Sequence, residues 1–120
     1  METTCDSTSL KSCKKIIGEG STEATSEMAK VTYKGYLSKD FDFEKTEQTA
    51  PTFDETSEGD YFSFPVGKGR VISCWDEQIA TMKIGEVATI QCPSSTAYGS
   101  RGVGQIPPNS DLTFQVKRFE

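Results

Sequence analysis

The chain contains no histidine, and its cysteines form no Cys-x-x-Cys pair. A structural zinc site therefore lacks its usual ligand spacing and half of its usual ligand types. We expect neither a metal ion nor a cofactor. The four cysteines are Cys5, Cys13, Cys74 and Cys92.

The chain also lacks an excess of basic residues and any long apolar run. It has 13 Lys and Arg against 18 Asp and Glu, a net charge of −5, which disfavours nucleic acid and anionic membranes as partners. Acidic residues crowd residues 40–60, where Lys45 is the only base. No stretch approaches the length of a membrane span, and residues 1–15 have no apolar segment of a secretory signal.

These absences predict a cytoplasmic location, with the nucleus as an alternative. Cysteines in those compartments are kept reduced, so free thiols are expected. A disulfide between Cys5 and Cys13 remains an alternative, in a segment expected to be mobile.

What is present fits one globular domain, because 120 residues can bury a core of their own. Residues 1–13 show no periodicity and are expected to be a flexible tail. From Ala29 to Leu37 apolar and polar residues alternate, which predicts a strand with one face in solvent that includes Tyr36. Further short strands are expected at residues 14–17, 53–54, 61–66, 87–92 and 112–119.

One convincing helix follows the glycine-rich turn at residues 67–69. Ser73 is expected to be its N-cap, with Asp76 completing an approximate capping box. Trp75, Ile79 and Met82 recur on one helical face. The expected fold is therefore α+β, with a five- to six-stranded antiparallel sheet wrapped around one short helix.

Residues 38–51 are harder to interpret. Asp40 to Phe43 alternates like a strand, and the rest reads as loop. A calcium loop is a weak alternative, because no glycine follows the acids and Pro51 occupies the closing position where a glutamate is needed. We expect a solvated loop or bulged strand, with a partner contact through Phe41 and Phe43 as the alternative.

Large aromatic side chains come from more strands and loops than would be needed to cover one short helix. This pattern suggests a dry aromatic bowl with Trp75 as its floor. Phe62 is expected to belong to the bowl and Phe64 to the core. The other rings of this kind are Tyr33, Phe53 and Phe114.

A series of short motifs resembles the FKBP-type peptidyl-prolyl isomerases, the family that binds tacrolimus and rapamycin. The resemblance covers residues 16–119 and implies an isomerase domain at residues 14–120 with an insertion at 38–51. In order, the motifs are Val31 to Leu37, Phe53-Asp54, Phe62 to Phe64, Val66 to Lys68, Val71 to Trp75, Ala80 to Met82, Gly85, Ala97-Tyr98-Gly99 and Ile106-Pro107-Pro108.

The resemblance also implies the site. Trp75 would be the floor beneath a proline ring, while the Ile72 amide and the Tyr98 hydroxyl would bond ligand carbonyls. The implied catalytic residues are Tyr33, Phe53, Asp54, Ile72, Trp75, Tyr98 and Phe114. The implied substrate- and drug-binding residues are Phe62, Arg70, Val71 and Ile106.

The sequence departs from the family pattern at several points. The loop after Tyr98 is one residue shorter than usual and lacks a common histidine. Arg70 stands where an acid is common, at a position that contacts ligands through its backbone carbonyl. Cys74 replaces a common glycine and is expected to be a small packing residue.

The function implied is rotation of X–Pro peptide bonds in proline-containing polypeptides by a monomeric enzyme whose pocket also takes macrolides. An alternative is a catalytically weak domain that acts as a chaperone or docking module. A third expectation places the physiological role in a region beyond Glu120, because many larger relatives add helical repeats.

Overall fold

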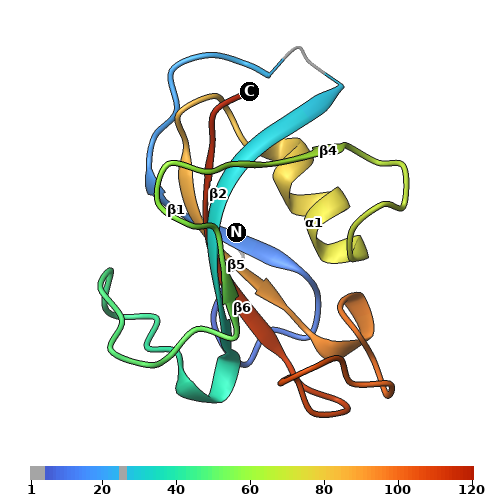
Figure 1. Cartoon of the computed structure of the whole chain (residues 1–120). Helices are drawn as coiled ribbons and strands as arrows, with labels where there is room; N and C mark the ends of the chain where they lie inside the picture. Colours follow the sequence, from blue (N-terminus) through green and yellow to red (C-terminus); the bar gives the residue numbers. More distant parts are fainter. Residues whose placement is uncertain (1–4, 25–26) are drawn as a thin grey trace.

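The computed structural model describes residues 5–24 and 27–120. Six antiparallel strands form one sheet beside a single α-helix among these residues, which confirms the expected α+β class (Figure 1). Each strand lies within two residues of its predicted position. The strands are β1 (Cys13–Gly18), β2 (Met28–Leu37), β3 (Asp54–Glu55), β4 (Phe62–Pro65), β5 (Val87–Cys92) and β6 (Leu112–Arg118).

The sheet runs in the order β1-β5-β6-β2-β3, and β4 pairs with the other end of β2. In the centre of the sheet, Phe114 of β6 lies opposite Gly35 of β2 on one side and Ile90 of β5 on the other. Apolar side chains from β2, β5 and β6 meet the helix in one buried cluster. No helix in the described ranges has the length and apolarity needed to cross a bilayer.

The helix α1 (Ser73–Gln78) continues into a 3-10 turn at Ile79–Thr81, and Trp75 and Ile79 are buried as its periodicity predicts. The expected capping box is wrong. Ile72 occupies the N-cap position, and Ser73 donates its hydroxyl to the carbonyl of Thr96 instead. The carboxylate of Asp76 instead accepts hydrogen bonds from the preceding turn, as described below.

The insertion is not a strand. It starts with a 3-10 turn at Ser38–Asp40 and continues as irregular chain, on the side of the sheet away from α1 (Figure 1). The Phe41 ring is buried against Tyr36, with ring centroids 5.3 Å apart, and Phe43 packs on Phe41. The prediction of a solvent face at Tyr36 is therefore wrong, because the insertion covers it.

Polar contacts fix the insertion to the sheet as well. Gln115 of β6 donates to the carbonyl of Thr46, and Lys15 of β1 donates to the carbonyl of Phe43. The calcium alternative gains no support: within the described ranges no three acidic or cysteine side chains are grouped to hold a metal ion. The insertion lies on the back of the sheet.

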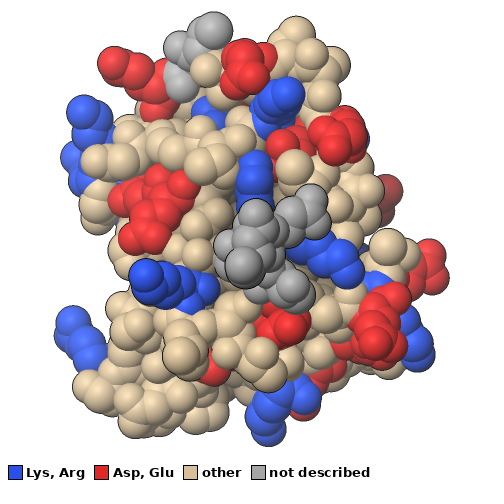
Figure 2. All heavy atoms as spheres, turned by 180° about the vertical axis from the view of Figure 1, so that it is seen from behind, with Lys and Arg blue, Asp and Glu red and all other residues tan. Residues whose placement is uncertain are grey.

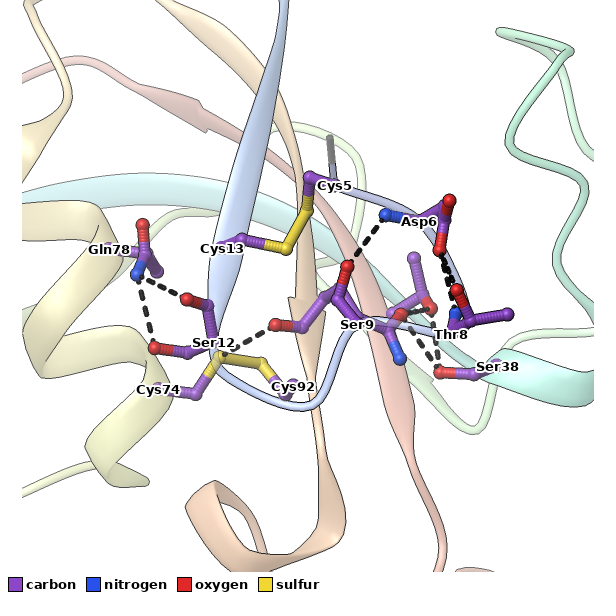
Figure 3. Close-up of a disulfide and its surroundings, with 12 residues drawn as sticks. Cys5, Asp6, Thr8, Ser9, Ser12, Cys13, Ser38, Cys74, Gln78 and Cys92 are labelled. Atoms are coloured by element: carbon purple, nitrogen blue, oxygen red, sulfur yellow. Dashed lines mark hydrogen bonds between the residues drawn. A yellow bond between two sulfur atoms is a disulfide. The ribbon is translucent and has the colours of Figure 1, made fainter. Parts of the chain in front are cut away.

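The expectation of free thiols is also wrong, because all four cysteines are paired. Cys5 is joined to Cys13, and Cys74 is joined to Cys92 (Figure 3). Cys74 therefore does more than pack. The cytoplasmic location was inferred partly from reduced thiols; it loses that support and stays a prediction.

The tail is attached over the part that the structure describes. Ser12 donates its hydroxyl to Glu77 and accepts two hydrogen bonds from Gln78, both on α1. Residues 1–4 of the expected flexible tail lie outside the described residues. The back of the molecule carries both signs of charge, with Lys and Arg scattered among Asp and Glu (Figure 2).

Candidate functional site

A cavity of about 260 Å³ opens above α1, at the β2, β3 and β4 end of the sheet. It draws side chains from strands β2, β3, β4 and β6, from the loops that carry residues 70–72 and Tyr98, and from the helix. Its lining consists of Tyr33, Phe53, Asp54, Phe62, Arg70, Val71, Ile72, Trp75, Tyr98 and Phe114. A hollow of about 470 Å³ lies elsewhere, between the tail and the insertion, but its lining is mostly polar.

Trp75 forms the floor of this cavity. The indole is only 5% exposed, yet it lines the open space. Its ring meets the Tyr33 ring at 4.9 Å and the Phe114 ring at 5.2 Å between centroids, both edge to face. The indole N–H has no hydrogen-bond partner among the described residues. The bottom of the cavity is consequently formed by aromatic rings.

Gly35 sets how closely the wall rings can approach the sheet. A Cβ at this position would lie 2.7 Å from Phe53 and 2.9 Å from Phe114, closer than real side chains allow. The Phe53 N–H also donates to the Gly35 carbonyl at 2.9 Å. Sequence reasoning did not assign this role. The available signal was a glycine inside a strand, which often marks a close approach.

One polar pair stands at the wall of the cavity. The Tyr33 hydroxyl donates to the Asp54 carboxylate at 2.6 Å. Burial, reinforced by this carboxylate, raises the pKa of Tyr33, and burial together with Asp54 raises the pKa of Tyr98. Both phenols therefore remain protonated hydrogen-bond donors at neutral pH.

The turn before the helix presents the Ile72 amide. The Asp76 carboxylate accepts the N–H groups of Gly67 at 2.9 Å and Gly69 at 3.0 Å, and both glycines have positive φ. Within the described ranges, the N–H of Ile72 makes no hydrogen bond and is available to a ligand. Asp76 is thus a positioning residue that sequence reasoning assigned to a helix cap.

Of the eleven site residues that the family resemblance implies, ten line this cavity. Ile106 does not: it is buried in the core and exchanges backbone hydrogen bonds with Val103. Phe64 is buried as expected, whereas Phe62 is 39% exposed at the cavity. The roles of these side chains in binding and catalysis stay predictions.

Comparison with known proteins identifies the family to which this chain is similar. A model of the FKBP-type peptidyl-prolyl cis-trans isomerase family matches residues 20–118. The human peptidyl-prolyl cis-trans isomerase FKBP4 is 56% identical over 62 residues, 51% of this chain and 14% of the relative. Isomerase FPR2 of Saccharomyces cerevisiae is 47% identical over 72 residues, 58% of this chain and 53% of the relative.

A relative named FK506-binding protein 4, from Gibberella zeae, is 38% identical over 106 residues, which is 88% of this chain and 19% of that protein. The chain thus spans only about a fifth or less of two of these relatives and about half of the third. The family match nevertheless covers most of the chain and includes every residue that lines the cavity. The chain belongs to the family of FKBP-type peptidyl-prolyl cis-trans isomerases.

Proposed function

We propose that this chain catalyses cis-trans isomerisation of X–Pro peptide bonds in polypeptides. The observation that carries the proposal is the cavity floored by Trp75, with protonated phenols and a free amide at its edge. The favoured substrates have an apolar residue before the proline, because Phe53 and Tyr98 flank the opening.

The chemistry needs no nucleophile. Rotation about the prolyl bond is slow because it breaks the amide resonance, with a barrier of about 18–20 kcal/mol. The twisted amide has a less polar carbonyl than the planar one. A water-poor aromatic cavity therefore stabilises the twisted form more than the planar form, which is the differential binding that catalysis requires.

Hydrogen bonds would hold the flanking peptide while the bond turns. The Ile72 amide and the Tyr98 hydroxyl are donors placed to do this at the cavity. The Asp54 carboxylate, which accepts the Tyr33 hydroxyl, would polarise the surroundings of the moving carbonyl.

The test is a protease-coupled tetrapeptide assay with a Leu–Pro substrate. We expect the oxidised wild-type chain to accelerate isomerisation well above the uncatalysed rate, which is set by exchange over tens of seconds or longer. Tyr98→Phe removes one hydrogen bond from the transition state and should lower kcat/KM by roughly three- to tenfold. Tyr61→Phe, on an exposed tyrosine outside the cavity, is the matched control. Background turnover by folded wild type would favour a binding module over an enzyme.

We also propose that the cavity binds tacrolimus- and rapamycin-like macrolides. A ligand that binds only the folded state stabilises it by about 2.7 kcal/mol when present at 100 times its dissociation constant. Tacrolimus should therefore raise the melting temperature of the oxidised protein in a dye-based thermal scan. An unchanged melting temperature at saturating drug, with isomerase activity intact, would contradict macrolide binding but leave the enzymatic proposal standing.

A further inference from the structure

The disulfide Cys74–Cys92 ties together the two segments that supply the floor and the edge of the cavity. Cys74 directly precedes Trp75 in α1, and Cys92 ends β5 just before the loop that carries Tyr98. Side-chain ties between these segments are otherwise sparse, the bond from Ser73 to Thr96 being one of them. Since α1 has only six residues, this covalent bond restrains the backbone directly before the indole.

The tail loop at residues 5–13 runs beside this disulfide. In the pairing of β1 with β5, Cys13 lies opposite Gln91, which brings Ser12 beside Cys92. Ser12 is also hydrogen-bonded to Gln78, one helical turn beyond Cys74. Figure 3 shows the tail chain running past Cys74 and Cys92. Both inner cysteines are 0% exposed and belong to the buried core cluster.

The tail loop is itself closed by the second disulfide, Cys5–Cys13. Cys5 is 8% exposed and Cys13 is partly buried, whereas both inner cysteines are 0% exposed, so the outer bond lies nearer to solvent than the inner one. Thiol–disulfide exchange needs direct access of a thiolate to a sulfur atom. A reductant can therefore reach Cys5–Cys13 first, and reach Cys74–Cys92 only after the loop has opened.

We propose that Cys74–Cys92 is a positioning element of the isomerase pocket and that the loop closed by Cys5–Cys13 guards it. The result is a two-step response to a dithiol reductant. The first step opens the loop without affecting the pocket, and the second releases α1 from β5 and lowers activity. This inference rests on the proposed isomerase function for its activity readout only.

The chemistry of each step balances with a dithiol as the reductant. One thiolate attacks a sulfur of the disulfide, the S–S bond breaks, and the other cysteine leaves as a thiolate that takes up a proton. The second thiolate of the reductant then attacks the mixed disulfide and releases the remaining cysteine. Two electrons pass to the protein, two protons end on its thiols, and the reductant becomes a disulfide.

The order of reduction is measured with dithiothreitol as the probe. Samples of native protein are quenched with iodoacetamide over time, and the alkylated cysteines are counted by peptide mass spectrometry. Cys5 and Cys13 should be alkylated first. In wild type, reduction of the inner bond should show a lag while the outer bond is reduced, and in the paired variant Cys5→Ala with Cys13→Ala this lag should be absent, because local opening is no longer restrained. Reduction of the inner bond without a lag in wild type would overturn the guarding role.

The positioning role is measured with a matched pair of variants. Cys5→Ala with Cys13→Ala should keep the wild-type kcat/KM. Cys74→Ala with Cys92→Ala should remain folded but lose roughly tenfold or more in kcat/KM, because small displacements of positioning groups are costly. Its indole emission should shift to longer wavelength as water reaches Trp75. Unchanged emission and activity in this variant would overturn the proposal.

Two further outcomes are decisive. If the inner variant loses its far-ultraviolet circular dichroism signal, and fully reduced wild type does the same, the bond is merely structural and the positioning role is wrong. If oxidised wild type shows no isomerase activity, the proposed function fails. The order of alkylation and the indole emission still test the two-step response in that case.

Discussion

Replacing Trp75 by leucine is expected to lower kcat/KM for a Leu–Pro peptide by about tenfold or more, which corresponds to at least about 1.4 kcal/mol of transition-state stabilisation. The indole contacts the rings of Tyr33, Phe62 and Phe114, and it is the floor against which a proline would lie. A leucine is smaller and would let water into the cavity. Water stabilises the planar amide, so the advantage of the twisted form would shrink.

Trp75→Leu also costs stability, by about 2–4 kcal/mol, because a large buried ring is lost. The control must lose stability without touching the cavity, and Ile79→Ala meets this need: Ile79 is fully buried on the same face of the helical segment but does not line the cavity. Both variants are assayed below their melting temperatures. Equal losses of activity would mean that Trp75 acts through stability alone.

Removing the negative charge of Glu86 is expected to cost about 1.5–3 kcal/mol of folding free energy, because a largely buried lysine loses its charged partner and keeps only the carbonyl of Thr81. Glu86 lies between the helical segment and β5, and its carboxylate meets the Lys14 ammonium at 2.7 Å, with side chains 2% and 15% exposed. Lys14 sits on the edge strand β1, so this pair helps to hold the edge strand to the rest of the sheet. Glu86→Gln tests it by chemical denaturation.

Two controls accompany this variant. Glu23→Gln disrupts an exposed pair with Lys83, in which the side chains are 82% and 46% exposed, and should change stability by less than about 1 kcal/mol. The double variant Lys14→Met with Glu86→Leu removes both charges and should recover much of the loss, since a buried ion pair is often replaceable by apolar side chains. If Glu86→Gln cost no more folding free energy than Glu23→Gln, the pair of Lys14 and Glu86 would not contribute measurably to stability.

The strands and the helix were predictable because their side chains alternate with a regular period. Residues 112–116 show this well, since Leu112, Phe114 and Val116 are all buried as the pattern predicts. The cavity residues were predictable because ordered motifs carried them. Ile106 differs, because it lies in an irregular loop in which no periodicity indicates which way its side chain faces.

Long-range contacts were the part that the sequence did not reveal. The pairing of Cys74 with Cys92 depends on how α1 lies against β5, which no local pattern specifies. Tyr36 sits on the polar face of its strand, yet Phe41 covers it after the chain turns back. Asp76 has the spacing of a helix cap, and only the shape of the preceding turn shows that it binds Gly67 and Gly69.

The rings of Phe53 and Phe114 pack directly on Gly35. The backbone therefore sets the width of the pocket, whereas side chains at its opening set which ligands it prefers. Main-chain atoms of β2, which are anchored by pairing on both sides, act as the stop against which Phe53 and Phe114 rest. Side chains at the opening, such as Arg70, can then be exchanged without altering the gap between floor and wall. Evolution, or a designer, can change the side chains at the opening on such a frame while the spacing between floor and wall is preserved.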